Sequence, residues 1–454
     1  MSRTPASFES TAPQRPPDLP ELIGKYKVLA RLGSGATSEV FLADDPFNAR
    51  SVAIKRMRPN VQATAREERF SLRFFAAEAS LVGRLKHPNV VQIFDAVDDP
   101  AGAYLVMEYV PGVTLREFCD PGHLLSLEQV VEVGFKCAMA LSYVYRQGLI
   151  HRDVKPANIL VAVDGHDVTD LKITDFGSVL NLSAEETQIH RVGSLAYMSP
   201  EQLDGAALDS RADIYSLAAV LYHLVAGRAP FHADQQGALL QQIWQQEPPT
   251  LVGCREGVSE ALDRVIRGAL SKRRDQRPDD WEQFANQLSA LIVNNQVPRG
   301  PLQRVLDSER FNLLRALDFF TEFEDAELWE VVHRASWQRF PLGHRIFKVG
   351  QTGKRFHILA QGEVTVFRDE QRVATLGPGT SVGEMAYLAP SPALRVHSAE
   401  VLVTSACTTV SFTPTSLATL TQATRHRFDS GFIRVLVRRL HAAHEQLAHP
   451  RRIL

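Results

Sequence analysis

The stretch that decides the fold is His151-Arg152-Asp153-Val154-Lys155-Pro156-Ala157-Asn158, which follows an apolar segment with helical spacing. Within it, Asp153, Lys155 and Asn158 place a carboxylate, an ammonium and a carboxamide close together. A carboxylate can accept the proton of an attacking hydroxyl, an ammonium can neutralise a moving phosphoryl group, and an amide oxygen can ligate Mg²⁺. The segment therefore predicts phosphoryl-transfer chemistry.

Segments on either side supply further parts of a phosphate site. Asp175-Phe176-Gly177 follows the strand-like LKIT and adds a second hard oxygen ligand for a cation. Upstream, Val52-Ala53-Ile54-Lys55 places a lysine in an apolar strand, where an unpaired ammonium is costly, so Lys55 needs an anionic partner. Glu78 lies in the helical stretch FFAAEASLVGRL and could be that partner, although taken alone it is more typical of a solvated helix face.

A glycine pair lies further upstream, in Gly33-Ser-Gly35-Ala-Thr-Ser38-Glu-Val40, between the strand-like YKVLARL and VFLA. Glycines in a hairpin let backbone N–H groups approach phosphate oxygens closely, although many such pairs are only turns. Downstream, Met198-Ser-Pro-Glu201 closes the series of motifs. The order and spacing of the whole set therefore carry more weight than any one motif.

In this order, the motifs resemble those of the eukaryotic-type protein kinases, over about residues 26–292. The resemblance implies an α+β bilobal fold, and Lys155 in the DxKxxN pattern is similar to serine/threonine rather than tyrosine kinases. Ser38 in place of a third glycine and the sequence Met198-Ser-Pro-Glu201 in place of the family's Ala-Pro-Glu depart from the consensus but remove no reacting group. The implied cofactors are ATP and Mg²⁺, and the implied partners are proteins with Ser or Thr hydroxyls.

The resemblance also implies a role for each matching residue. Asp153 would be the catalytic base, with Lys155 and Asn158 beside it, and Asn158 and Asp175 would hold Mg²⁺. Arg277 would pair with Glu201. The implied ATP site, in which Lys55 contacts the phosphates, Met107 is the gatekeeper and residues 108–110 form the hinge, comprises Gly33, Gly35, Ser38, Val40, Ala53, Lys55, Glu78, Met107, Glu108, Val110 and Leu160.

The segment from Asp175 to Glu201 contains candidates for regulatory phosphorylation. In kinases of this pattern, the arginine at the position of Arg152 clamps a phosphorylated residue through charge-assisted hydrogen bonds. Thr187 is the preferred candidate, followed by Ser194 and Ser183. The alternative function is a pseudokinase or scaffold, which would usually have lost the lysine, aspartate or asparagine that this chain retains.

Composition limits the remaining possibilities. The 454 residues allow about three compact units of ~150 residues. A net charge of −2 gives no overall field for nucleic acid or a membrane surface. Four scattered cysteines and the absence of a secretory pattern in MSRTPASFES favour a reducing cytoplasm. The most apolar stretch, from Tyr215 to Gly227, is too short to cross a bilayer and predicts a buried helix.

Breaker clusters and composition shifts predict the domain boundaries. We expect a disordered Pro-rich tail at residues 1–24, a kinase domain at 25–293 and a linker at 294–301 around QVPRGP. Within the kinase domain, the small lobe would span about residues 25–110 and the large lobe about residues 111–293. A second domain would occupy residues 302–454, where short Gly-punctuated strands lie between helical stretches.

The second domain resembles the cyclic-nucleotide-binding domains, a β-barrel (jelly-roll) with flanking helices. The resemblance implies that Gly383 and Glu384 begin a phosphate-binding cassette, that Glu384 bonds the ribose of cAMP or cGMP, and that Arg395 pairs with the cyclic phosphate. Arg395 lies one or two residues further on than is usual, and Val396 and His397 replace small residues. The alternatives are a barrel that binds another ligand, and an interaction or dimerisation module that binds no nucleotide.

The last helical stretch has apolar residues at helical spacing, among them Phe432, Ile433, Leu436 and Leu440, and is expected to be a lid or a homodimer helix. From Arg425 to Leu454, seven arginines against Asp429 and Glu445 give a net charge of +5. A solvated helix face is more typical of this pattern than a nucleic-acid helix. We therefore expect neither a membrane nor a nucleic acid as a partner.

Overall fold

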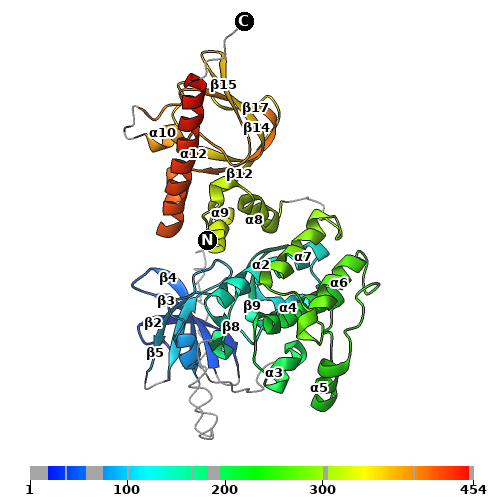
Figure 1. Cartoon of the computed structure of the whole chain (residues 1–454). Coiled ribbons are helices and arrows are strands. Elements are labelled where there is room, and N and C mark those ends of the chain that lie inside the picture. The colour runs from blue at the N-terminus through cyan, green and yellow to red at the C-terminus, as the bar shows by residue number, and fades with distance from the viewer. Residues whose placement is uncertain are drawn as a thin grey trace, which may run out of the picture. The chain divides into compact units, whose positions relative to one another are not determined.

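The computed structural model describes residues 19–35, 38–57, 75–99, 102–165, 167–181, 195–299, 305–389, 391 and 394–448. The chain forms two compact units (Figure 1). The first comprises Met1–Leu125 and Ala140–Phe284, and the second comprises Ser126–Met139 and Ala285–Leu454. Helix α2 (Leu127–Arg146) therefore begins in the second unit and ends in the first. This division differs from a boundary at the predicted linker, because the first half of α2 packs with the C-terminal helices.

Among the described residues, the first unit begins with an antiparallel sheet of six strands in the order β1-β2-β3-β4-β6-β5. The strands are β1 (Leu22–Ile23), β2 (Tyr26–Ser34), β3 (Ser38–Asp45), β4 (Arg50–Met57), β5 (Ile93–Val97) and β6 (Tyr104–Glu108). β-Branched and aromatic side chains such as Val28, Phe41 and Val52 build its core, as expected for a sheet with one covered face. Ile23 belongs to the same core, so the sheet begins within the region predicted as a tail.

The helical lobe follows the sheet (Figure 1). After α2 it contains α3 (Pro200–Asp204), α4 (Ser210–Ala226), α5 (Gln236–Gln245), α6 (Glu260–Ala269) and α7 (Trp281–Val293). Two short sheets hold the intervening loops. In one, β9 (Ile159–Asp164) lies between β10 (Asp167–Ile173) and β7 (Val113–Thr114). In the other, β8 (Leu149–Ile150) pairs with β11 (Leu180–Asn181).

Helix α4 is the buried helix that the apolar stretch predicts. Asp209 caps its N-terminus by accepting a hydrogen bond from the backbone N–H of Arg211, and Gly227 ends it in the left-handed region (φ 68°). Every residue from Ile214 to Leu221 is at most 2% exposed, so the helix has apolar contacts on all sides. This helix is therefore a rigid support for the loops packed against it.

The second unit contains a β-barrel with flanking helices, as the sequence predicts. Its strands are β12 (Ser336–Phe340), β13 (Arg345–Phe347), β14 (Phe356–Arg368), β15 (Gln371–Leu376), β16 (Ser381–Val382) and β17 (Glu400–Phe412). They pair antiparallel in the order β12-β17-β14-β15, with β13 beside β17 and β16 beside β14. The helices are α8 (Asp307–Arg315), α9 (Asp325–Arg334), α10 (Glu384–Leu388), α11 (Pro414–Ala418) and α12 (Gln422–Ala448).

The two long strands of the barrel bend at Gly362. Its φ of 81° is unfavourable for other residues, and a Cβ there would lie 2.7 Å from the Cα of Cys407. Shifts in the β14–β17 register around residues 361–363 mark a bulge that curves the sheet. Helix α12 covers the barrel, with the Phe432 ring 4.9 Å and the Phe428 ring 6.1 Å from that of Phe356. These aromatic contacts fix α12 against the strands. Figure 1 shows α12 running along the barrel.

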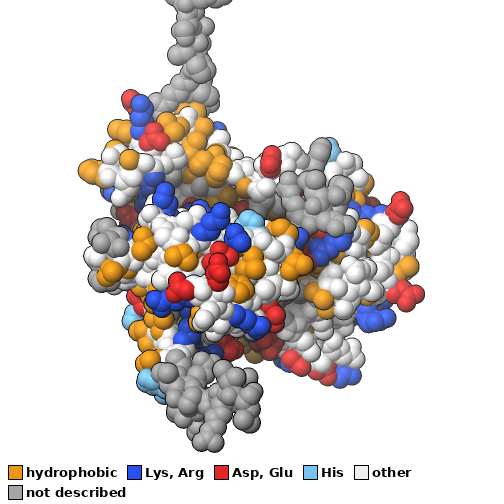
Figure 2. Space-filling view, turned by 90° about the horizontal axis from the view of Figure 1, so that it is seen from above, with side chains coloured by type: hydrophobic (Ala, Val, Ile, Leu, Met, Phe, Trp, Pro, Cys, Tyr) orange, Lys and Arg blue, Asp and Glu red, His pale blue; other side chains and the backbone are white. Residues whose placement is uncertain are grey.

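The surface agrees with the near-neutral composition. Acidic and basic side chains are interspersed over the described residues seen in Figure 2 rather than separated by sign. No helix in the described part of the chain is long and apolar enough to span a membrane.

Candidate active site

Lys55 is the centre of a partly buried charge cluster in the first unit. Its Nζ lies 2.9 Å from Glu78 Oε2 and 2.7 Å from Asp175 Oδ1. Strand β4 carries Lys55, and residues 75–79, which are helical, carry Glu78. Asp175 adopts a left-handed conformation (φ 68°) at the start of a 3₁₀ turn (Phe176–Ser178). The lysine thus has the anionic partner that its place in an apolar strand requires, and a second one besides.

Burial and charge act in opposite directions on this cluster. Burial lowers the pKa of Lys55, but Glu78 and Asp175 outweigh it and hold that pKa above its ordinary value. Burial raises the pKa of Glu78, against the effect of Lys55. Burial also acts to raise the pKa of Asp175, but Lys55 lowers it overall. Lys55 therefore carries a positive charge at neutral pH in a partly dehydrated site, where it can attract an anion strongly.

A second cluster forms in the loop between β8 and β9. Lys155 Nζ lies 2.7 Å from Asp153 Oδ2, and Asn158 Nδ2 donates to the same oxygen at 3.0 Å and to the Asp153 carbonyl at 2.8 Å. Pro156 begins the 3₁₀ turn (Pro156–Asn158) that brings Asn158 back toward Asp153. Both side-chain contacts use Oδ2 of Asp153, which leaves Oδ1 for a substrate. Burial raises the pKa of Asp153, although Lys155 opposes the shift.

Asp213 of α4 holds this loop in place. Its carboxylate is 3% exposed and accepts hydrogen bonds from the backbone N–H groups of His151 (2.7 Å) and Arg152 (2.8 Å). Arg152 has a φ of 67°, a strained value for a residue with a side chain, and the bond to Asp213 stabilises it. Sequence analysis missed Asp213. The available signal was a lone carboxylate in an apolar helix, which needs partners when it is buried.

The predicted pair between Arg277 and Glu201 is confirmed. The guanidinium makes two bonds to the carboxylate, at 2.6 Å and 2.9 Å, and its side chain is fully buried. It also donates to the carbonyls of Ser271, Arg211 and Lys272. Arg277 therefore links the backbone at residues 211, 271 and 272 to Glu201 at the start of α3.

The residues implied for the adenine end of the ATP site lie along β4 and β6. Ala53 and Met107 are neighbours in the sheet, and Glu108 ends β6. The Glu108 carboxylate lies 3.1 Å from the Nζ of Lys172 on β10, a contact that sequence analysis did not predict. Val110 and Leu160 are half-buried.

The glycine pair lies at the β2–β3 hairpin. Gly33 is paired with Val40, and the N–H of Gly35 donates to the carbonyl of Ser38 at 2.8 Å. Among the described residues, a Cβ at Gly33 would meet no atom within 4 Å, and one at Gly35 would meet only Ser38 O, at 3.6 Å. The fold itself therefore does not require glycine at either position. The three predicted phosphorylation sites, Thr187, Ser183 and Ser194, lie outside the described residues.

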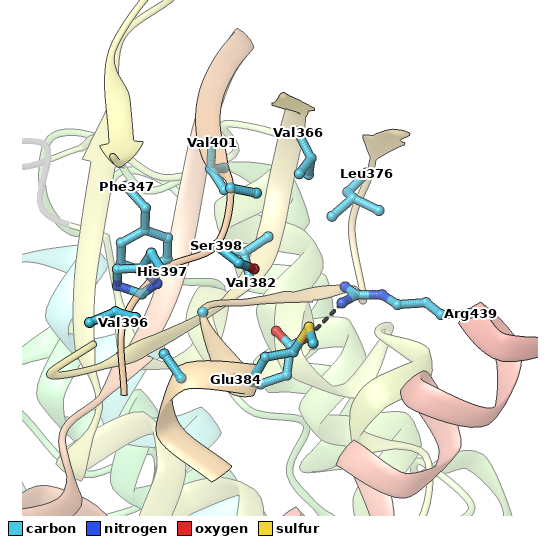
Figure 3. Close-up of a pocket in the computed structure, with 14 residues that line it drawn as sticks. Phe347, Val366, Leu376, Val382, Glu384, Val396, His397, Ser398, Val401 and Arg439 are labelled. Atoms are coloured by element: carbon cyan, nitrogen blue, oxygen red, sulfur yellow. Dashed lines mark hydrogen bonds and ion pairs between the residues drawn. The ribbon is translucent and has the colours of Figure 1, made fainter. Parts of the chain in front are cut away.

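The barrel contains a cavity of about 100 Å³ that includes Gly383 and Glu384 (Figure 3). Glu384 is 1% exposed, and its Oε1 lies 2.5 Å from Nη1 of Arg439 on α12. Its Oε2 is buried without a hydrogen-bond partner among the described residues. Arg439 also donates to the carbonyl of Ser381. The rest of the lining is mainly apolar, with Phe347, Val366, Leu376, Val382 and Val401 around the opening shown in Figure 3.

The structure does not bring Arg395 to this cavity. Arg395 is exposed, and among the described residues its Nε donates a hydrogen bond to the carbonyl of Ala389, at 3.5 Å. His397 instead stacks on Phe347, with ring centroids 3.9 Å apart, and both line the cavity. The cation at the cavity is therefore Arg439. In the sequence, Arg439 is one of the seven arginines counted from Arg425 to Leu454, and nothing there indicates its contact with Glu384.

Two family models match the chain. The protein kinase domain matches residues 26–288, and the cyclic nucleotide-binding domain matches residues 337–423. These matches confirm the predicted order, a kinase fold followed by a jelly-roll barrel.

Bacterial proteins are among the similar relatives. Serine/threonine-protein kinase PknB of Mycobacterium tuberculosis is 35% identical over 304 residues, which cover 64% of this chain and 46% of that protein. The protein of the same name from Mycobacterium leprae is 34% identical over 306 residues, or 65% of this chain and 47% of that protein. The chain thus spans about half the length of these curated relatives. It belongs to the protein kinase domain family and carries a C-terminal segment that matches the cyclic nucleotide-binding domain.

Proposed function

We propose that the chain transfers the γ-phosphoryl group of ATP to Ser or Thr hydroxyls of protein substrates. The observation that carries this proposal is the pair of charge clusters. Lys55 is held charged between Glu78 and Asp175, and Asp153 is held by Lys155 and Asn158. The first cluster can neutralise nucleotide phosphates, and the second can take a proton. The names of the PknB relatives support Ser and Thr as acceptors.

In the proposed reaction, Asp153 accepts the proton of the substrate hydroxyl while the hydroxyl oxygen attacks the γ-phosphorus. The new O–P bond forms, the bond from the γ-phosphorus to the bridging oxygen breaks, and ADP leaves with that electron pair. Lys155 lies beside Asp153 and is placed to neutralise charge on the phosphoryl oxygens. The raised pKa makes Asp153 a stronger proton acceptor than an exposed aspartate.

The donor set fits a magnesium ion. Asp175 binds Lys55 through Oδ1, so Oδ2 remains for a cation, and Asn158 uses Nδ2 for both of its bonds to Asp153, so Oδ1 remains. Two protein oxygens are typical of a Mg²⁺ site that is completed by phosphates and water. A bound Mg²⁺ would neutralise part of the phosphate charge.

The glycine hairpin supports a nucleotide close to β2 and β3. No contact within the described part of the chain requires glycine at positions 33 or 35. A side chain there would instead occupy space outside the hairpin, where a phosphate can approach the backbone N–H groups. The absence of side chains at Gly33 and Gly35 therefore has a functional explanation in ATP binding.

The test is transfer of labelled γ-phosphate from ATP to a general protein substrate, followed by phosphoamino-acid analysis. We expect label on Ser and Thr with the wild-type chain and only background with Asp153→Asn. Label that appears equally with both proteins would favour the pseudokinase or scaffold alternative. Label on Tyr would contradict the assignment of the acceptor.

A second function is favoured by the unpartnered Oε2 of Glu384. A buried carboxylate oxygen without a donor is costly, and a ribose hydroxyl would satisfy it. We infer that the cavity takes cAMP or cGMP, with Glu384 as the acceptor, and that the barrel thereby regulates the kinase. Titration of each nucleotide against the unfolding temperature tests this proposal. A ligand at 100 times its Kd stabilises by about 2.7 kcal/mol, and the absence of a shift with either nucleotide would favour an interaction module.

If the barrel is an interaction module, the surface of α12 favours a homodimer. Ile433, Val437 and Leu440 are 63%, 46% and 57% exposed and recur at helical spacing. Sedimentation of the chain at several concentrations distinguishes a monomer from a dimer. Substitution of Val437 by Glu should dissociate a dimer that uses this face.

We also propose activation through phosphorylation of Thr187, with Ser183 and Ser194 as further candidates. The support is the position of Arg152, whose N–H bonds Asp213 and whose carbonyl accepts from Gln202 beside the catalytic loop. A phosphate paired with this guanidinium would stabilise one conformation of the segment. Phosphopeptide mapping after autophosphorylation tests the assignment, and phosphate found only outside residues 178–194 would reject it.

A further inference from the structure

The first half of α2 (Leu127–Met139) packs with α8 and α9 within the second unit, and we call this packing the α2 junction. Lys136 is 4% exposed, and its Nζ lies 2.8 Å from Asp307 Oδ2. One turn earlier on α2, Glu132 accepts hydrogen bonds from the N–H of Ser308, at 3.1 Å, and from its hydroxyl. Two charged side chains of α2 are therefore matched by the first two residues of α8. Removing either partner would leave a buried charge, which is costly.

Aromatic side chains form the apolar part of the α2 junction. The ring of Phe311 on α8 lies 6.1 Å from that of Phe135 on α2 and 4.9 Å from that of Trp329 on α9. All three side chains are at most 1% exposed. Arg299 adds a bridge, since it lies 3.1 Å from Glu128 of α2 and 2.5 Å from Glu309 of α8. The three helices thus share one core, although α8 and α9 lie outside both family matches.

Helix α12 links α9 to the barrel cavity. Arg427 lies 3.4 Å from Glu327 of α9, and the N–H of Thr421 donates to Glu330 of α9 at 2.9 Å. Further along the same helix, Arg439 holds Glu384 in the cavity. A group that bonds Glu384 in place of Arg439 would therefore remove one contact of the C-terminal half of a helix whose N-terminal part is tied to α9.

We propose that Lys136 and Asp307 are positioning residues that transmit the state of the Glu384–Arg439 pair to the catalytic loop. Helix α2 continues from the junction to Arg146, and β8 then leads directly into His151. A shift of α8 against α2 therefore has a short covalent route to the loop that carries Asp153. The inference rests on the proposed function, because it takes the loop that carries Asp153 to be catalytic.

The experiment measures how Arg439→Gln acts in two backgrounds of the full chain. One background is wild type, and the other is Lys136→Met with Asp307→Asn. This double variant removes the ion pair together with the contacts of Asp307 to Arg310 and His333, while Glu132 keeps its hydrogen bonds from Ser308. Hydrogen exchange of residues 149–158 is followed in all four proteins, together with kcat and KM for ATP. In wild type we expect Arg439→Gln to change loop exchange and kcat by about 5- to 150-fold, the usual range of coupling between sites, with KM unchanged. In the second background we expect no response.

A matched control removes an exposed ion pair, through Arg273→Gln with Asp275→Asn, whose side chains are 71% and 61% exposed. The response to Arg439→Gln should persist there. Ser308→Ala keeps the Lys136–Asp307 pair but removes the hydroxyl bond to Glu132 at the same junction. It should therefore weaken the response to Arg439→Gln. This variant replaces Lys136→Met with Asp307→Asn if the double variant does not fold.

An equal response in both backgrounds, or no response to Arg439→Gln in wild type, would overturn the inference. Hydrogen exchange separates this result from failure of the proposed function. If hydrogen exchange of the loop responds to Arg439→Gln only in wild type but no protein transfers phosphate, the role of the α2 junction is supported and the kinase activity is rejected. If phosphate is transferred but loop exchange responds equally in both backgrounds, the kinase activity is supported and the role of the junction is rejected.

Discussion

The two charge clusters of the candidate active site and the barrel cavity organise their charges differently. In the first unit, Asp153 and Asp175 each bind a lysine through one oxygen and keep the other for a ligand. In the barrel, Glu384 has a single cation, Arg439, and its second oxygen has no partner among the described residues. The first arrangement is oriented before a ligand arrives, which is the condition for electrostatic catalysis. The second has to exchange a partner when a ligand binds, which suits a sensor.

The comparison depends on how much free energy is lost when a buried charge loses its partner. Among the variants proposed, Arg277→Met should have the largest effect. This change leaves the buried Glu201 without a cation, so we expect the free energy of unfolding at pH 7 to fall by about 3–5 kcal/mol. Urea unfolding measures it. Glu201→Gln combined with Arg277→Met is the control, since it removes both charges and should recover part of the loss.

The pH dependence of this pair has a definite sign. Burial acts to raise the pKa of Glu201, but Arg277 lowers it below the ordinary 4.5. The contribution of the pair is therefore complete above about pH 4.5 and is lost as the pH falls through the lower, folded-state pKa. The difference between wild type and Arg277→Met should shrink in acid. A difference that stays constant from pH 7 to pH 3 would contradict the assignment.

Lys55→Met tests the oriented charge of the catalytic clusters. We expect kcat to fall by about 10²–10³-fold, the usual cost of removing one preorganised group that stabilises charge. A kinase assay with saturating ATP measures the change. Lys27→Met, at an exposed lysine of the same sheet, should leave kcat unchanged. A Lys55→Met protein with more than a tenth of the wild-type rate would show that this ammonium does not act on the phosphates.

Arg439→Gln tests the exchange of partners in the barrel. If a nucleotide has to displace Arg439, the variant should bind cAMP or cGMP about tenfold more tightly, a gain of about 1.4 kcal/mol. Calorimetric titration of both proteins measures the ratio. Arg438→Gln is the matched control, because Arg438 lies next in sequence but pairs with Asp318 away from the cavity. Weaker binding by Arg439→Gln would instead assign Arg439 to the ligand.

The smallest effect on stability is expected at Gly33. Gly33→Ala meets no neighbour, so we expect its effect on the free energy of unfolding to stay within about 1 kcal/mol, while KM for ATP rises. Gly362→Ala should destabilise the barrel clearly, because of its positive φ and the close approach of Cys407. Thermal unfolding of both variants decides this prediction. A strongly destabilised Gly33→Ala would show that the hairpin needs glycine for its own fold.

Much of the candidate active site was predictable because several of its residues lie close together in sequence, in short motifs. Asp153, Lys155 and Asn158 belong to a single short segment of the sequence. A lysine within an apolar strand, such as Lys55, needs an anionic partner. The barrel was predictable for a similar reason, since glycine-punctuated strands specify it locally.

The remaining features depend on contacts between distant residues. Asp213 and the Glu108–Lys172 pair arise only when α4 and β10 pack against the catalytic loop and β6. The contact between Arg439 and Glu384 depends on where α12 crosses the barrel, which no spacing indicates. The grouping of the first half of α2 with α8 and α9 likewise comes from tertiary packing rather than from any breaker in the sequence.

The central claim is that Asp153 is the proton acceptor of a phosphoryl-transfer site. The most direct measurement is the ratio of the transfer rates of wild type and Asp153→Asn, at saturating ATP and Mg²⁺ and as a function of pH. We predict a ratio of about 10²–10⁴ at neutral pH. We also predict that the wild-type rate falls in acid with a midpoint above 3.8, because burial raises the pKa of Asp153. A ratio near one would contradict the account.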